Sequence, residues 1–598
     1  MPSTQAPTNF PTSTSSSAPS SKRLRVPKPN LPLELGKYIE KDVKLLSKLG
    51  WQNFVKQRRQ RSDLNILNIN HPAQHVLKNY KHNGVPVRFS TKPWSKAKLT
   101  QALRRGPHQS CHNYIDFLES EFSDMISKSQ WVILPFDVAK SLPNLRLSPP
   151  GVIPQRDRRP RWICDYSFYG VNQETLPLVP TESMQFGRAL ERYLRELLLA
   201  DPANGTLYML KLDISDGYYR MALTPSDIPK LGVVFPTPPN AKPLVALPLV
   251  LPMGWKNSPP AFCAASETSA DIANINLSTS RPTRNHPLES HAAKYDEHFS
   301  PPITLPAHNH QKSPHNLLAP TARDPSLPTN QAPIQYIDVF VDDFLGICQG
   351  EKNKSHVRQT LLHAVDDVFR PNDFHDSLFR REPVSLKKLR QGDCSWSTIK
   401  QVLGWIINTA TMTISLPEHR QERLGEILAS VPLTQKRLSV KRWHKILGEL
   451  RSMSLALPGS RGLFSSMQLA LSKKSKNRIK LRNGVHQAIN DFRWLHKDIC
   501  NRPTRIAEII PLSPSALGYH DAAGIGAGGV WYPTPDLTPR QGTHQQQPLL
   551  WRLQWPQDIV ESLVSSSNPN GTINNSALEL AGGLLHLDVI AQEYDTRE

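Results

Sequence analysis

Residues 338–343 read Asp-Val-Phe-Val-Asp-Asp and place two adjacent acids, Asp342 and Asp343, between two apolar runs. The runs, residues 339–341 and 344–347, are short and rich in β-branched and aromatic side chains, so they predict two strands joined by a tight turn. Adjacent carboxylates repel each other unless a cation neutralises them, and hard carboxylate oxygens suit Mg²⁺. The alternative is an ordinary hairpin turn with two solvated acids, because turns are rich in Asp.

Two further segments favour the metal site over the ordinary hairpin turn. Residues 207–213 form an apolar run that ends in Asp213, followed by a turn with a glycine, so a third carboxylate is expected at the end of a strand. Between the acids, residues 251–262 read Leu-Pro-Met-Gly-Trp-Lys-Asn-Ser-Pro-Pro-Ala-Phe, which predicts a loop leading into a helix.

These three motifs, in this order, resemble the palm of reverse transcriptases. The resemblance implies that Asp213, Asp342 and Asp343 hold two Mg²⁺ ions, with Mn²⁺ as the alternative cation, and that the backbone carbonyl of Ile214 completes one metal shell. Phosphoryl transfer mainly requires positioning and charge neutralisation, so carboxylates and metal ions suffice without a covalent nucleophile. Tyr218 takes the place of an aromatic residue that blocks a ribose 2′-hydroxyl; its alternative is a packed core tyrosine.

More of the family pattern lies on either side. Residues 158–172 resemble the fingers strand, in which a basic residue four before an Asp grips the triphosphate; here it is Arg161, before Asp165. A guanidinium suits this task because its planar fork binds phosphate oxygens in pairs. The neighbouring arginines are expected to act only through nonspecific charge. The resemblance also assigns nucleotide contacts to Met253, Gly254 and Lys256. Two residues depart from the pattern, Phe340 for a commoner Tyr and Met253 for a commoner Gln.

Composition agrees with a nucleic-acid partner. The 598 residues include 72 Lys and Arg against 51 Asp and Glu, a net charge of +21, and such an excess raises affinity for a polyanion through counterion release. No apolar run is long enough to span a bilayer and no apolar signal segment follows the N-terminus, so we expect an intracellular, cytoplasmic or nuclear, protein. The six cysteines are scattered, which predicts free thiols rather than a zinc knuckle.

Residues 271–333 are rich in proline and histidine and poor in apolar clusters, so we expect a surface excursion from the palm. The expected organisation is a disordered Ser/Thr/Pro-rich tail (1–30), a mostly helical lead-in (31–130), fingers and palm (131–420, with the insertion at 271–333), thumb and connection (421–500) and a partial ribonuclease H-like domain (505–598).

That last assignment rests on Asp521, in a strand-like segment, and Glu579, near the start of a predicted helix. The pair resembles the first two carboxylates of a ribonuclease H domain. The family needs a third carboxylate on a later strand, and here Asp588 and Asp595 fall within or just after the helix. We therefore expect a truncated domain with an exposed sheet edge and no independent ribonuclease H activity.

The predicted fold class is α+β: a right-hand polymerase of fingers, palm and thumb, then a truncated α/β ribonuclease H-like domain. The motifs resemble gypsy-like and DIRS-like retrotransposon polyproteins. The predicted function is primer-dependent DNA synthesis on an RNA or DNA template–primer from deoxynucleoside triphosphates. The alternatives are a non-catalytic nucleic-acid-binding remnant of a decayed retroelement and a host-adopted reverse transcriptase with a cellular task. No heptad pattern decides the oligomeric state.

Overall fold

The computed structural model places most of the chain, and contacts divide it into two units. The tail at 1–30, most of the predicted insertion and Asp595 lie outside the described residues. One unit comprises residues 1–63, 78–178 and 218–261, and the other residues 64–77, 179–217 and 262–598. The structure describes residues 33–59, 61–65, 69–155, 158–179, 184–238, 241–279, 284–296, 332–370, 382–457, 459–472, 477–510, 516–533 and 548–594.

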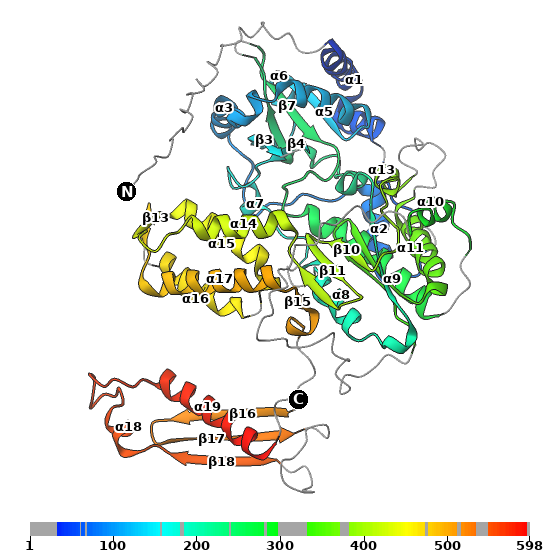
Figure 1. The fold of residues 1–598 in the computed structure, drawn as a ribbon. Helices are drawn as coiled ribbons and strands as arrows, with labels where there is room; N and C mark the ends of the chain where they lie inside the picture. The colour runs from blue at the N-terminus through cyan, green and yellow to red at the C-terminus, as the bar shows by residue number, and fades with distance from the viewer. Residues whose placement is uncertain are drawn as a thin grey trace, which may run out of the picture. The chain divides into compact units, whose positions relative to one another are not determined.

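The first unit packs helices against a small mixed sheet (Figure 1). The sheet has the order β1-β7-β6-β2, in which only β2 and β6 run parallel. A separate antiparallel ribbon pairs β3 with β4. The helices and strands of this first unit are α1 (Leu33–Arg58), α3 (Lys96–Arg105), α4 (Gln109–His112), α5 (Ile115–Ser127), β1 (Trp131–Pro135), α6 (Phe136–Ala139), β2 (Leu147–Ser148), β3 (Pro150–Gln155), β4 (Arg158–Cys164), α7 (Val171–Glu174), β6 (Gly232–Phe235) and β7 (Leu244–Pro248).

Phe122 on α5 is the centre of this unit's core. The helix buries one apolar face because Leu118, Phe122 and Met125 recur at helical spacing. The ring of Phe122 meets three aromatic rings from the sheet and the ribbon edge-on, with centroids 5.0–5.5 Å apart. This contact ties the helical segment before residue 130 to β1, β4 and β6.

The second unit is built on an antiparallel sheet with the order β5-β9-β8. β5 (Leu207–Asp213) is the predicted apolar run that ends in Asp213, and β8 (Gln335–Phe340) and β9 (Asp343–Gln349) form the predicted hairpin. Helices that belong to or enter this part are α2 (Gln74–Asn83), α8 (Ala189–Leu198), α9 (Ser258–Ser278), α10 (Glu289–Ala293), α11 (Lys354–Phe369) and α13 (Leu386–Leu389).

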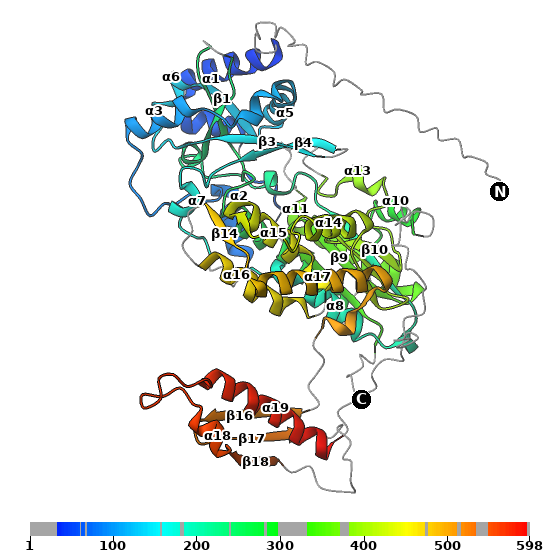
Figure 2. The same cartoon turned by 60° about the vertical axis from the view of Figure 1, so that its left-hand side comes forward.

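A second sheet and a helical bundle continue the same unit (Figure 2). The sheet has the order β10-β11-β12-β15, and one buried apolar cluster runs from Tyr193 and Ile347 through Ile407 into the bundle at Trp443 and Phe492. The elements are β10 (Ile399–Val402), β11 (Trp405–Asn408), β12 (Thr413–Ser415), α14 (Glu418–Ala429), β13 (Arg437–Ser439), α15 (Val440–Met453), α16 (Leu463–Ser472), β14 (Arg478–Lys480), α17 (Asn483–Asn501) and β15 (Thr504–Arg505).

The predicted excursion at 271–333 is wrong at its start. Residues 271–278 continue α9, and residues 284–296 are held against α11 by the buried guanidinium of Arg358. That guanidinium bonds both oxygens of Glu289 at 2.8 Å and also contacts Asp296. His286, which is buried, bonds Asp366 at 3.0 Å. Its prolines and histidines and its few apolar clusters predicted a surface excursion, whereas ion pairs hold residues 284–296 in the folded body.

The C-terminal part is a three-stranded antiparallel sheet covered by one long helix. β16 (Ala516–Ala523), β17 (Gly526–Pro533) and β18 (Leu549–Gln554) lie in that order, so β16 is an edge among the described strands. α19 (Asn575–Glu593) packs on β16 and β17, and α18 (Gln557–Glu561) precedes it. Asn574 caps α19 by accepting a bond from the Ala577 backbone N–H.

Candidate active site

The sheet β5-β9-β8 brings the three predicted aspartates to one edge. Asp213, the last residue of β5, pairs in register with Asp343, the first residue of β9. Asp342 lies in the turn before it, and its backbone carbonyl accepts a hydrogen bond of 3.2 Å from the Ile214 N–H. Two acids from one hairpin and one from a strand distant in sequence therefore share one site.

The hairpin turn that carries Asp342 holds an unusual backbone conformation. Phe340 pairs with Asp343, so Val341 and Asp342 form a two-residue turn, and Val341 has φ 59°. Positive φ at the first turn position is typical of a type II′ turn, but it is uncommon for a β-branched residue. A Cβ added at Gly217 would lie 3.5 Å from Oδ2 of Asp342, so the glycine turn after β5 also borders this carboxylate.

The site concentrates negative charge in a partly buried place. Burial raises the pKa of Asp342 to about 6, and repulsion from Asp343 and Asp213 adds to the effect. Burial also raises the pKa of Asp213, although Lys388 opposes that shift. The carboxylates thus lack enough positive charge for all of them to ionise at their ordinary pKa.

Two lysines that the sequence analysis did not identify supply part of that charge. The ammonium of Lys388 lies 2.5 Å from Oδ1 of Asp213, and that of Lys211 lies 3.1 Å from Oδ1 of Asp343. Burial alone would lower the pKa of Lys388, but its bond to Asp213 and the charge of Asp343 raise it instead. Lys211 had a usable signal, since it lies two residues before Asp213 in β5 and so on the same face. Lys388 had none.

The donor set suits a hard divalent cation, since it consists of carboxylate oxygens with uncompensated negative charge. Within the described ranges, however, no group of three or more His, Cys, Asp or Glu side chains is arranged to hold a metal ion. Ammonium groups hold two of the three carboxylates. A divalent cation at this site would therefore have to displace Lys388 and Lys211 from their oxygens.

Four predicted nucleotide-binding residues lie together in the first unit. Arg161, exposed on β4, points Nη2 at the sulfur of Met253, 3.5 Å away. Gly254 has φ 98°, and a Cβ there would lie 2.4 Å from the Cys164 carbonyl oxygen, so only glycine fits this turn. Asn172 fixes the loop by donating to the Gly254 carbonyl at 2.9 Å and accepting from the Lys256 N–H at 3.0 Å. The Lys256 ammonium is bonded to the Thr175 carbonyl at 3.0 Å.

The other two residues predicted to contact the nucleotide, Ile214 and Tyr218, lie shortly after Asp213 in the sequence. Ile214 is buried. Tyr218 is half-buried in the short helix Gly217–Arg220. It is the first residue of the segment 218–261, which belongs to the first unit. Its predicted role toward a ribose remains a prediction.

The two C-terminal acids, Asp521 and Glu579, lie on β16 and α19. Alternation along β16 puts His520 and Ala522 on the face covered by α19, since both lie against Gly582 of that helix. Asp521 therefore points to the opposite face, away from the helix that carries Glu579. The pairing of Asp521 with Glu579 in one site stays a prediction.

No family model and no curated protein matches the chain. Many solved structures are similar to it, among them two of foamy viral protease-reverse transcriptase. The foamy viral protease-reverse transcriptase dRH in complex with double-stranded DNA has 12% identity and a TM-score of 0.41 over 91% of this chain and 73% of that chain. The foamy viral protease-reverse transcriptase in complex with double-stranded DNA has 13% identity and a TM-score of 0.38 over 85% of this chain and 82% of that chain. At these TM-scores the likeness assigns no role to any residue.

A helix needs a certain length and hydropathy to span a membrane. No helix in the described part of the chain is both long and apolar enough to cross a bilayer.

Proposed function

We propose that the chain is a reverse transcriptase of a gypsy-like or DIRS-like retrotransposon, which extends a primer on an RNA or DNA template. The observation that carries the proposal is the register pairing of Asp213 with Asp343, with Asp342 in the adjoining turn. Strand pairing gives these carboxylates a fixed backbone framework, as positioning of phosphoryl-transfer groups requires.

In this proposal Asp213, Asp342 and Asp343 hold Mg²⁺ once Lys388 and Lys211 release their oxygens. The bound cations would neutralise charge on the triphosphate and lower the pKa of the primer 3′-hydroxyl. Arg161 would bind the triphosphate through its planar fork, since it is exposed and contacts the loop of Met253. The Asn172 amide would keep that loop in place through its two backbone bonds.

A second candidate function is template binding without catalysis, as in a decayed retroelement. The specific observation in its favour is that lysines hold two of the three carboxylates. In that case the site would be a structural ion-pair cluster, and only the basic surfaces would act.

The deciding experiment is primer extension on an RNA template with deoxynucleotides and Mg²⁺. Parent protein, Asp342→Asn and Asp343→Asn are compared, and each is checked for salt-sensitive template binding. Extension by the parent and loss of about a thousandfold in both variants, with binding retained, would support the polymerase. Retained binding with no extension by any of the three proteins would favour the non-catalytic candidate.

Tyr218→Ala tests the sugar selectivity that the proposal assigns to this residue. Ribonucleotide extension should increase relative to deoxynucleotide extension if the aromatic ring blocks the 2′-hydroxyl. An unchanged ratio with a lower melting temperature would indicate a core tyrosine instead.

A further inference from the structure

The ribbon of β13 and β14 has one strongly basic face. Arg437 pairs directly with Lys480, and Ser439 with Arg478, while Leu438 and Ile479 are buried on the other side. Like charges directly opposite each other in an antiparallel pair repel. Arg437 and Lys480 are exposed, yet both line the same cavity as the buried Ile479, and an anion in that cavity would relieve their repulsion.

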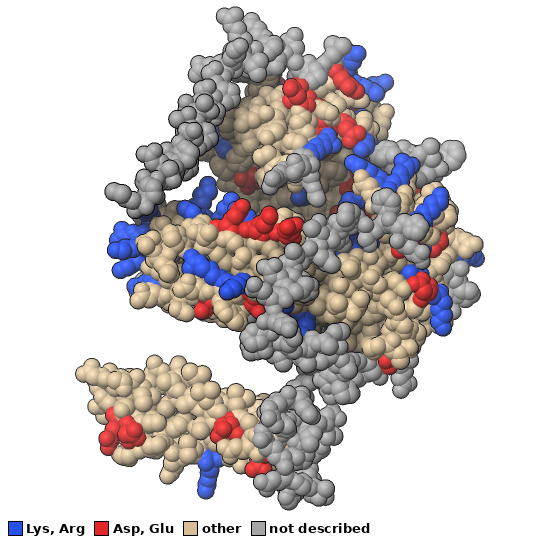
Figure 3. Space-filling view, viewed as in Figure 1, with Lys and Arg blue, Asp and Glu red and all other residues tan. Residues whose placement is uncertain are grey.

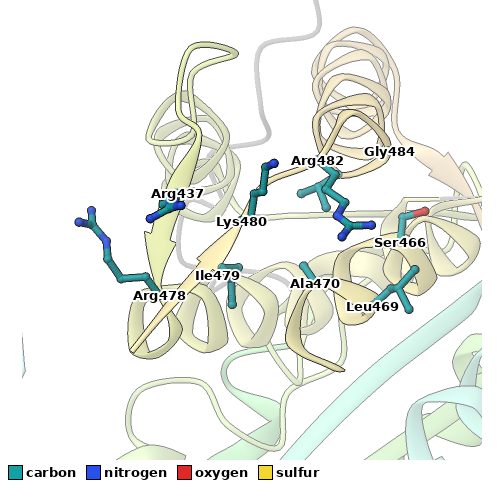
Figure 4. A pocket seen from close by; sticks show the side chains of 10 residues that line it. Arg437, Ser466, Leu469, Ala470, Arg478, Ile479, Lys480, Arg482 and Gly484 are labelled. Atoms are coloured by element: carbon teal, nitrogen blue, oxygen red, sulfur yellow. The ribbon is translucent and has the colours of Figure 1, made fainter. Parts of the chain in front are cut away.

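A cavity of about 450 Å³ lies between this ribbon and the helices α16 and α17 (Figure 4). Its wall is apolar where Leu469, Ala470 and Val485 contribute, and Leu469 is 65% exposed. Arg482 comes from the residue before α17, so the positive end of that helix also borders the cavity. The lining thus combines an apolar surface with cations.

The surrounding chain has almost no negative charge to balance these cations. Residues 427–490 contain thirteen Lys and Arg but a single acid, Glu449, which pairs with Arg423 at 2.7 Å. Within the described residues, the side chains of Arg437, Lys480 and Arg482 have no ion pair. Figure 3 shows Lys and Arg gathered at the end of the bundle that carries β13.

We propose that this cavity binds one nucleotide unit, with the base on the apolar wall and the phosphates on Arg437, Lys480 and Arg482. A bare phosphate would leave the apolar wall exposed, and an apolar ligand would leave the cations unmatched. Arg forks bind the oxygens of phosphates and of carboxylates in pairs, so the cations alone do not distinguish a nucleotide from an acidic peptide. The apolar wall favours the nucleotide, because a base can cover that wall and the side chains of Asp and Glu cannot. The volume lies within the range of small-ligand pockets.

The nucleotide has two sources, a free mononucleotide or one unpaired position of a single strand. The proposal does not depend on polymerase activity, because binding is measured in EDTA, where phosphoryl transfer cannot occur. A protein that fails to extend primers can therefore still confirm this site, and a polymerase can lack it.

The test is fluorescence anisotropy with a labelled single strand, the same strand carrying an abasic position, and a duplex, all with the full chain. Lys480→Met and Arg482→Met remove cations of the cavity. Arg461→Met is the matched control, since Arg461 is exposed, basic and outside the cavity lining. Leu469→Ser removes part of the apolar wall. Melting temperatures check folding, and Arg482→Lys should partly restore binding.

We expect each cavity variant to weaken single-strand binding by about fivefold, and Arg461→Met by less than about twofold. The intact strand should bind the parent more tightly than the abasic strand, and Leu469→Ser should remove that difference. ATP, added as an unlabelled competitor, distinguishes the sources: displacement at similar concentration indicates a free nucleotide, and no displacement indicates a strand. Equal losses in all arginine and lysine variants, no effect of the abasic position, preference for the duplex, or displacement by polyglutamate would each overturn the proposal.

Discussion

The Nζ atom of Lys388 lies 2.5 Å from Oδ1 of Asp213, so an ammonium group occupies the carboxylate that ends β5. The two residues are 175 positions apart in the sequence. The lysine and a divalent cation would compete for the same oxygen. Metal binding and the position of Lys388 are therefore coupled.

Replacing Lys388 with Met should expose this competition. Without Mg²⁺, the free energy of unfolding should fall by less than about 1 kcal/mol, because Lys388 is substantially exposed and its pair is screened. With Mg²⁺, the melting temperature should rise more in the variant than in the parent, since the cation no longer displaces an ammonium. Lys387→Met, at an exposed neighbouring position, is the control. An equal Mg²⁺ response in both variants would contradict the coupling.

Asp342 should make the metal-free protein less stable as pH rises. Its pKa is about 6 in the folded protein against a usual value of 3.8, so between these values the folded state holds a proton that the unfolded state has lost. Stability should therefore fall by about 3 kcal/mol as pH increases through that window. Asp342→Asn should reduce this slope, and the part that remains comes from carboxyls such as Asp213 whose pKa is also raised. Urea unfolding in EDTA measures the slope. The exposed Asp116→Asn should keep it; a slope unchanged in Asp342→Asn would contradict the assignment.

Arg358 should be critical for stability. Its buried guanidinium binds Glu289 and Asp296, so Arg358→Met leaves two carboxylates without their cation. We expect a loss of about 3–5 kcal/mol in the free energy of unfolding, measured in urea. Arg390→Met, at an exposed position, should change it by less than about 0.5 kcal/mol. Similar values for both variants would mean that segment 284–296 adds little to the fold.

Gly254→Ala should disrupt the loop that carries Met253 and Lys256. The new Cβ would lie 2.4 Å from the Cys164 carbonyl oxygen, at a backbone φ of 98°. We expect a loss of about 1–3 kcal/mol in stability and a marked loss of primer extension. Gly187→Ala has no atom within 4 Å of its Cβ and serves as the control. Full activity in Gly254→Ala would show that the loop tolerates another conformation.

Local pattern was sufficient for several elements. The strand ending at Asp213, the hairpin around Asp342 and the helix beginning at Ser258 all follow from periodicity, turn residues and prolines close to them in sequence. A mixed helix-and-sheet protein was therefore predictable. So was the placement of Asp213 and Asp343 at strand ends and of Asp342 in the adjoining turn, because each acid directly borders an apolar run.

Tertiary structure decided what those elements contact. Lys388 reaches Asp213, Arg358 draws residues 284–296 into the body, and Asp521 turns away from the helix of Glu579. None of these has a local signal, because each depends on which distant segment packs against which face. A short pattern specifies the period of a helix or strand, whereas the partner of a charged side chain is set by packing over the whole chain.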